Sequence, residues 1–252
     1  MIEEYLVSNL NKKERVFTYV KGDPANETVV FMHGLGGTHI GYRELIDKLA
    51  EKYFVYAPHI PSFGYSTAPL KFDIENYIDN LWQVFSTYKI KNKATIIGHS
   101  FGGAIATKML LRDQSMFEKL VLINSAGISP KDDTEYLDWI LKTMDVSRKF
   151  LRNIKTDKKM IKRTFQDIIL STVRLKDIYK TAGIIISLNM LEDFARVEVP
   201  TSLLWSRQDN YFPLEVAERI NKTITGSHLK IVDSKKGHSW CMVEPDLVLN
   251  NI

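Results

Sequence analysis

The sequence predicts an α/β protein with a mostly parallel central sheet of about eight strands, flanked by helices. Short β-rich runs alternate with amphipathic stretches along most of the chain, and several runs are apolar throughout, as strands covered on both faces should be. The alternation breaks once, from about Ile128 to Arg196, where only helix-like segments occur. We therefore expect a core of residues 1–127 and 197–252 and a helical cap, or lid, of residues 128–196.

The elements follow in order along the chain, and the sheet is expected to begin with an antiparallel N-terminal pair. The expected strands are Glu14–Val20, Val29–His33, Phe54–Pro58, Thr95–His99, Leu120–Ser125, Ser202–Ser206 and Leu229–Asp233. The expected helices are Tyr42–Lys52, Ile74–Tyr88, Gly103–Arg112, Leu214–Lys222 and Pro245–Asn251, with Glu135–Met144, Lys158–Leu170 and Lys176–Leu188 in the cap. Because long insertions after a strand are usually functional, we place the cap over the carboxyl edge of the sheet, where open α/β sheets bind ligands.

Composition limits the class of protein. The 252 residues are 44% hydrophobic, enough for one sizeable core. The first residues are charged where a signal peptide needs an apolar stretch, and no run approaches the roughly 18 apolar residues of a membrane span. The single cysteine, Cys241, excludes an intrachain disulfide, and no Cys/His cluster has metal-ligand spacing. We expect a cytoplasmic protein without stable membrane insertion, metal or cofactor, as a monomer or homodimer.

Positive charge is concentrated in one segment. The formal net charge is +4, and nine of the basic residues lie between Lys142 and Arg163 against two acids. Such a segment is either a solvated helix face or a surface that attracts acidic substrates or a membrane. No nucleic-acid-binding motif accompanies it, so we expect no nucleic-acid partner.

The motif Gly98-His99-Ser100-Phe101-Gly102 lies between an expected strand and an expected helix. A sharp strand-to-helix turn requires small residues two positions before and two positions after the serine, here Gly98 and Gly102, and it exposes the serine hydroxyl. The strand–turn–helix context favours Ser100 as a nucleophile, and the alternative is a glycine-rich packing turn.

A serine nucleophile needs a base and an acid that orients the base. Of six histidines, only His238 lies in a polar loop after the last expected strand, which makes it the candidate base; the alternative is a solvated loop histidine. Asp209 follows the preceding strand and is the candidate acid, unless it serves only as a turn residue. Asp233, Glu192 and Asp193 are less well placed.

The oxyanion that forms during acyl transfer needs two donors. The backbone N–H of Phe101, at the start of the helix after the serine, is one candidate. The backbone N–H of Leu35 is the other, in a glycine-rich loop that follows the expected strand Val29–His33. Gly34, Gly36 and Gly37 could instead form an ordinary strand-to-helix turn. A phosphate-binding loop is not expected, because the sequence contains no phosphate-loop motif.

Five motifs in this order resemble the α/β-hydrolase superfamily, in its small, capped branch of serine esterases and C–C hydrolases. They are Met32-His33-Gly34-Leu35-Gly36-Gly37, Ala57-Pro58-His59-Ile60-Pro61-Ser62-Phe63-Gly64-Tyr65-Ser66, Gly98-His99-Ser100-Phe101-Gly102-Gly103, Trp205-Ser206-Arg207-Gln208-Asp209 and Gly237-His238. The sequence departs from the family pattern at three supporting positions, with His59 for an aspartate, Ser62 for a glycine and Ser206 for a glycine. A serine at position 100 argues against the dehalogenases and epoxide hydrolases of this fold, which use an aspartate there.

The resemblance implies a carboxylesterase that cleaves small to medium esters through an acyl-enzyme. Four apolar side chains are candidates for the substrate pocket: Trp139, Met144, Tyr211 and Trp240. One alternative is a C–C bond hydrolase of β-diketone-like acids, because the basic cap could receive a carboxylate. Another is a non-catalytic hydrolase-fold receptor for a small ligand, which fluorophosphonate labelling would distinguish.

Overall fold

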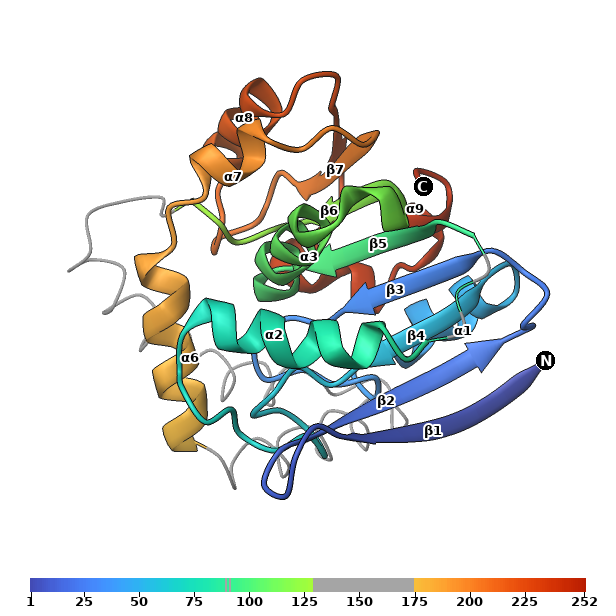
Figure 1. Ribbon diagram of the computed structural model, residues 1–252. Helices are drawn as coiled ribbons and strands as arrows, with labels where there is room; N and C mark the ends of the chain where they lie inside the picture. The colour runs from blue at the N-terminus through green and yellow to red at the C-terminus, as the bar shows by residue number, and fades with distance from the viewer. Residues whose placement is uncertain (89, 91, 129–174) are drawn as a thin grey trace, which may run out of the picture.

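The computed structural model describes residues 1–252 except 89, 91 and 129–174, and its centre is an eight-stranded sheet of order β1-β2-β4-β3-β5-β6-β7-β8 (Figure 1). The strands are β1 (Ile2–Asn9), β2 (Arg15–Gly22), β3 (Thr28–Met32), β4 (Phe54–Pro58), β5 (Ala94–His99), β6 (Phe117–Ile123), β7 (Thr201–Ser206) and β8 (His228–Val232). The helices are α1 (Arg43–Ala50), α2 (Ile74–Phe85), α3 (Phe101–Arg112), α6 (Leu175–Ser187), α7 (Leu191–Ala195), α8 (Leu214–Thr223) and α9 (Asp246–Leu249), with 3₁₀ turns η1 (Gln114–Met116) and η2 (Gly237–Met242).

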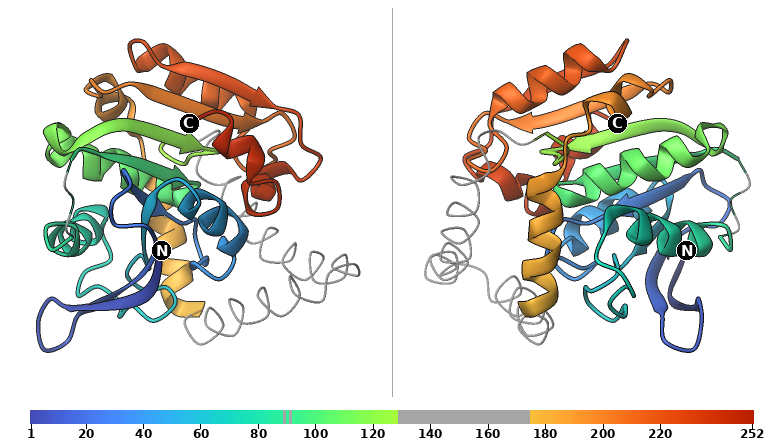
Figure 2. Two further views of the ribbon diagram at one scale, coloured as in Figure 1. Left: turned by 90° about the vertical axis from the view of Figure 1, so that its right-hand side faces the viewer. Right: turned by 60° about the vertical axis from the view of Figure 1, so that its left-hand side comes forward.

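Helices cover both faces of the sheet because its central strands are apolar on both sides. In β3, Val30 and Met32 pack with buried residues of α2, α3 and α8, whereas Val29 and Phe31 pack with α1, η2 and α9. Successive side chains of a strand point to opposite faces, so one uniformly apolar run supplies two cores. Two further views show these two helical layers on either side of the sheet (Figure 2).

Six neighbouring strands of the sheet, β4-β3-β5-β6-β7-β8, run parallel to one another, so their carboxyl ends meet at one edge. The expected antiparallel pair at the N-terminus is confirmed, since β1 pairs with β2 and β2 pairs antiparallel with β4. The fold class predicted from the sequence is therefore correct. Loops that carry Gly34, Ser100, Asp209 and His238 all follow the carboxyl ends of these strands.

Three elements differ from the prediction. The range of β1 was not predicted, because an edge strand half exposed to solvent lacks a continuous apolar run. Strand β6 ends at Ile123 rather than at residue 125, since Asn124 adopts a φ of 43° and leaves the sheet. The segment around His238 forms the 3₁₀ turn η2 rather than an open polar loop.

The cap prediction falls mostly outside the described residues, and with it Trp139, Met144 and the basic segment. The described parts of residues 128–196 are a bridge between Ile128 and Asn189, and helices α6 and α7. Helix α6 lies at the edge of the sheet toward which β3 and β5 point (Figure 1). Among the described residues, no helix is long and apolar enough to cross a bilayer.

Candidate active site

Ser100 lies in a strained turn between β5 and α3. Its φ of 56° and ψ of −125° place it in a region that side chains other than glycine rarely adopt. The strain persists because hydrogen bonds hold the turn: Ser100 N–H donates to the carbonyl of Ile123 at 3.0 Å, and Ser100 C=O accepts from Ala126 N–H at 2.9 Å. The turn therefore presents the serine side chain at the carboxyl edge of the sheet.

Two glycines allow the chain to pass this closely. A Cβ on Gly98 would lie 2.3 Å from the carbonyl oxygen of Gly102, and a Cβ on Gly102 would lie 2.1 Å from that of Met32. Both distances are well inside van der Waals contact with backbone atoms that cannot move aside. Glycine is therefore required at both positions, as the motif indicates.

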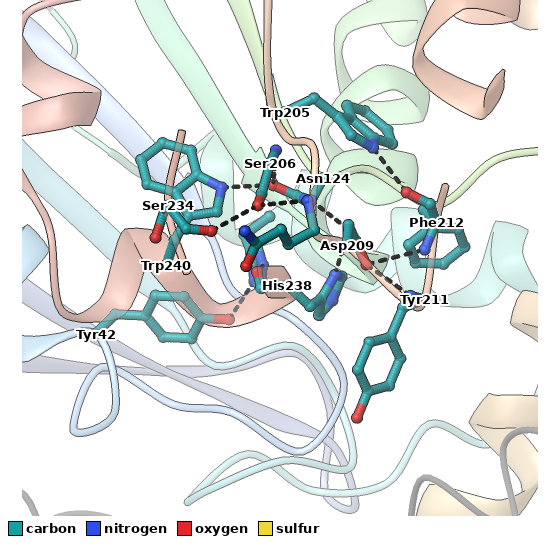
Figure 3. A network of polar contacts seen from close by, with 12 residues as sticks. Tyr42, Asn124, Trp205, Ser206, Asp209, Tyr211, Phe212, Ser234, His238 and Trp240 are labelled. Carbon is teal, nitrogen blue, oxygen red and sulfur yellow. Dashed lines mark hydrogen bonds and ion pairs between the residues drawn. The ribbon is translucent and has the colours of Figure 1, made fainter. Parts of the chain in front are cut away.

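His238 and Asp209 form a directly bonded pair. His238 Nδ1 lies 2.8 Å from Asp209 Oδ2, and the carboxylate side chain has no exposed surface whereas the imidazole is 12% exposed (Figure 3). Because the carboxylate accepts, Nδ1 carries a proton and Nε2 is left as the basic nitrogen of the neutral ring. The ring also contacts the ring of Tyr211, with centroids 4.6 Å apart.

Four donors surround the Asp209 carboxylate. Oδ1 accepts from the N–H groups of Tyr211 at 2.7 Å and Phe212 at 3.1 Å, while Oδ2 accepts from His238 and from the side-chain amide of Asn124. Burial alone raises the pKa of this carboxyl, but the charge and hydrogen bond of His238, followed by the hydrogen bonds of Asn124 and of Tyr211 N–H, bring the pKa below its ordinary value. Asp209 is therefore ionised at neutral pH.

Asn124 and Trp240 form the support beneath this carboxylate. The Asn124 side-chain oxygen accepts from the indole N–H of Trp240 at 2.6 Å, and both side chains are fully buried (Figure 3). An accepting oxygen fixes the orientation of the amide, whose N–H₂ then points at Asp209. Asn124 is not among the site residues predicted from the sequence, because nothing local in the sequence signals these long-range contacts.

The other acids considered for this role lie elsewhere. Asp233 is exposed, and no described hydrogen bond links it to His238. Asp193 pairs with Lys108 Nζ at 3.0 Å. Of the three acids named at the outset besides Glu192, only Asp209 contacts the histidine.

The loop after β3 approaches Ser100 closely. A Cβ on Gly34 would lie 3.1 Å from Ser100 Cβ, which brings the next residue, Leu35, beside the nucleophile turn. Within the described chain, no hydrogen bond engages the backbone N–H of Leu35 or of Phe101. Both N–H groups can therefore donate a hydrogen bond to an incoming oxygen.

The Ser100 hydroxyl has no hydrogen bond to His238 among the described residues. Ser100 directly follows His99 in the chain, however, and the ring centroid of His99 lies 4.7 Å from that of His238. Contacts between nucleophile and base are often loose in a protein without substrate and tighten when it binds.

The candidate pocket residues have different positions. Tyr211 is half-buried beside His238 and can reach a substrate there. Trp240 has no exposed surface, so the expectation that it lines a pocket does not fit its position in the core. Trp139 and Met144 lie outside the described residues. In the described ranges, no group of three His, Cys, Asp or Glu side chains could hold a metal ion.

A family model for the alpha/beta hydrolase fold matches residues 27–142. The chain has the α/β-hydrolase fold. This confirms the fold implied by the resemblance read from the five motifs.

Relatives of this α/β hydrolase match along most of its length. An uncharacterized hydrolase, YugF, of Bacillus subtilis is 24% identical over 91% of this chain and 90% of its own. A 2-hydroxy-6-oxo-2,4-heptadienoate hydrolase of Pseudomonas putida is 24% identical over 87% of this chain and 85% of its own. The solved structure of an esterase from Exiguobacterium antarcticum superposes with a TM-score of 0.79 at 19% identity, covering 94% of this chain and 95% of that one.

Proposed function

We propose that this α/β hydrolase is a serine carboxylesterase acting on esters of small to medium size. The observation that carries the proposal is the combination of a strained turn at Ser100 with a buried, ionised Asp209 that is hydrogen-bonded to Nδ1 of His238. A glycine-rich packing turn does not require backbone strain, and a solvated loop histidine does not require a buried carboxylate. The nucleophile, base and acid roles together account for all three features.

In the proposed reaction, Nε2 of His238 takes the hydroxyl proton of Ser100 as Oγ attacks the ester carbonyl carbon. The carbonyl oxygen becomes an oxyanion held by the N–H groups of Leu35 and Phe101. The imidazolium then gives its proton to the leaving alcohol as the C–O bond breaks, which leaves an acyl-enzyme on Ser100. Water, deprotonated by His238, hydrolyses the acyl-enzyme in the same way and restores the serine. No cofactor is needed.

The ionised Asp209 supports this sequence electrostatically. It fixes the tautomer of His238 that leaves Nε2 free, and its negative charge stabilises the imidazolium that forms at each proton transfer. The first residue of α3, Phe101, offers its N–H at a helix N-terminus, where the helix dipole also favours an oxyanion.

A second candidate is a C–C bond hydrolase of β-diketone-like acids. The Pseudomonas putida relative, named as a hydrolase of 2-hydroxy-6-oxo-2,4-heptadienoate, favours it, as does the basic segment Lys142–Arg163. A panel of p-nitrophenyl esters assayed beside a vinylogous diketone acid separates the two: the carboxylesterase proposal requires the esters to have the higher kcat/KM.

The decisive experiment compares the wild-type protein with Ser100→Ala. We expect a fluorophosphonate probe to label the wild type at Ser100 and to leave the variant unlabelled. Esterase activity should fall by several orders of magnitude in the variant while the melting temperature changes little, because the substitution removes one hydroxyl. Retention of most ester hydrolysis by Ser100→Ala would refute the mechanism, and a wild type that neither labels nor hydrolyses would favour the receptor alternative.

A further inference from the structure

A chain of hydrogen bonds runs from the loop after β3 to the turn that carries His238, through two buried side chains. Tyr42 Oη accepts from Gly34 N–H at 3.1 Å and lies 2.5 Å from His99 Nδ1. His99 Nε2 lies 2.9 Å from the backbone carbonyl oxygen of His238. In Figure 3 the hydroxyl of Tyr42 points into the site, on the side where His238 lies. Neither Tyr42 nor His99 was selected as a site residue from the sequence.

The direction of each hydrogen bond follows from its ends. The carbonyl of His238 can only accept, so His99 carries its proton on Nε2 and donates there. His99 Nδ1 then has no proton and accepts from the hydroxyl of Tyr42, whose oxygen accepts in turn from Gly34 N–H. Burial, followed by the neighbouring charge of His238, lowers the pKa of His99 to about 3, so the ring stays neutral at physiological pH.

The two ends of this chain coincide with two groups of the proposed mechanism. Gly34 directly precedes Leu35, whose N–H is a proposed oxyanion donor. His238 is the proposed base, and His99 directly precedes Ser100 in the sequence. The chain of hydrogen bonds thus links three separate segments: the loop after β3, the nucleophile turn and η2.

The segments joined by this chain of hydrogen bonds lie close together. Gly34 has no side chain of its own, and a Cβ there would lie 3.0 Å from Tyr42 Oη, so the loop and the tyrosine are closely packed. The His238 ring is bonded to Asp209, but its backbone carbonyl is held by His99. Loss of the Tyr42 hydroxyl would leave the Gly34 N–H and the His99 Nδ1 without this partner in a buried region.

We propose that Tyr42 and His99 are positioning residues, which hold the Leu35 N–H and the His238 imidazole in the correct position relative to Ser100. The inference rests on the proposed function, because it assigns the two side chains to the geometry of that reaction. Neither touches the reacting atoms; they act through Gly34 and through the backbone of His238. Displacements of about 1 Å in such groups can cost about a hundredfold in rate.

The first test is Tyr42→Phe, which removes the hydroxyl and keeps the ring. We expect kcat for a p-nitrophenyl ester to fall about ten- to a hundredfold with little change in KM. The rate of Ser100 labelling by a fluorophosphonate should fall by a similar factor, since labelling needs the same nucleophile, base and oxyanion donors. Tyr88→Phe is the matched control: the Tyr88 hydroxyl is also buried and bonded, to Thr18 Oγ1 at 2.9 Å, but on the other face of the sheet. It should lower the melting temperature comparably and leave kcat unchanged.

The second test compares His99→Gln with His99→Leu. The glutamine amide supplies one N–H donor for the His238 carbonyl and one oxygen acceptor for Tyr42, whereas leucine supplies neither. We expect Gln to retain a larger share of kcat and of the labelling rate than Leu. This pair also decides the question if Tyr42→Phe does not fold, which a thermal melt would reveal.

The outcomes separate the two proposals. If the wild type is labelled at Ser100 but Tyr42→Phe and His99→Leu keep its kcat and labelling rate, Tyr42 and His99 only stabilise the fold and the inference is overturned. Equal kcat in His99→Gln and His99→Leu would also overturn it. A wild type that is not labelled at all overturns the proposed function, and the inference with it.

Discussion

At the scale of single residues, the candidate site contains a carboxylate, Asp209, whose surroundings keep it charged although it is buried. An isolated buried carboxylate would take up a proton, but four donors around Asp209 stabilise its ionised form. The orientation of one of these donors, Asn124, is fixed by Trp240. The acid and its supports therefore form one unit, and the pKa of the carboxyl depends on all of them.

This arrangement predicts different effects for the two aspartates that follow β7 and β8, Asp209 and Asp233. Asp209→Asn should lower kcat about 10³- to 10⁴-fold, because an amide can hold the wrong tautomer of His238 and cannot stabilise its imidazolium. Asp233→Asn is the matched control and should change kcat little, since Asp233 is exposed. Steady-state kinetics on one ester measure both variants, and a larger loss in Asp233→Asn would reassign the acid.

At the scale of elements, local patterns predicted most of the framework and missed what depends on contacts distant in sequence. The ranges expected for β3, β4, β5 and β7 agree with the structure to within a residue or two, because buried parallel strands are uniformly apolar. The range of β1 was missed because its burial is partial and irregular along the strand. The positions of Ser100, His238 and Asp209 could be read from motifs at strand ends. Asn124, Tyr42 and His99 could not, because their contacts span tens of residues.

A prediction at this scale concerns the cap, residues 128–196, which we propose as the determinant of substrate choice. An insertion at this point follows β6 and leads into α6 at the edge where Ser100 lies. Trp139→Ala or Met144→Ala should enlarge the substrate pocket and shift the preferred acyl length. The relative kcat/KM of short and longer esters should change by about 1–3 kcal/mol per methylene of misfit.

The measurement is kcat/KM across a series of p-nitrophenyl esters of increasing acyl length. Met116→Ala is a suitable control, because Met116 is partly exposed in η1 at the amino end of β6, away from Ser100. An unchanged ranking of esters in both cap variants would indicate that specificity comes from the loops that carry Leu35 and Tyr211 instead.

At the scale of the whole molecule, four buried histidines lie at the carboxyl edge of the sheet. His33, His39, His59 and His99 follow or end β3, β4 and β5, and each is at most 5% exposed. They are bonded as neutral rings: His59 Nδ1 accepts from Tyr65 N–H at 3.1 Å, so its Nε2 donates to His39 Nδ1 at 2.7 Å. Protonation of either ring at Nδ1 would cost one of these hydrogen bonds, because that nitrogen could then no longer accept.

Burial lowers the pKa of His33 and of His39 to about 4, lowers that of His59 well below its ordinary value, and lowers that of His99 to about 3. Between the unfolded value of about 6.5 and these folded values, the unfolded chain takes up protons that the folded chain does not. These histidines should therefore leave the free energy of unfolding unchanged between about pH 7 and 8 and lower it as the pH drops from 6.5 toward 4. Each neutral histidine contributes a slope of up to about 1.4 kcal/mol per pH unit. The lowered pKa of Asp209 acts below pH 4, outside this window.

Urea unfolding at pH 7.5, 6.5, 5.5 and 4.5 measures this slope. His39→Gln should reduce it by about one histidine's share, because the substituted side chain takes up no proton in the unfolded state. His228→Gln is the matched control: His228 is exposed on β8, so its substitution should leave the slope unchanged. A free energy of unfolding that stays level or rises on acidification from pH 6.5 to 4.5 would show that these histidines are charged in the folded protein. The directions of the hydrogen bonds assigned to His59 and His99 would then also be wrong, because a charged ring donates from both nitrogens and could not accept from the Tyr65 N–H or from Tyr42.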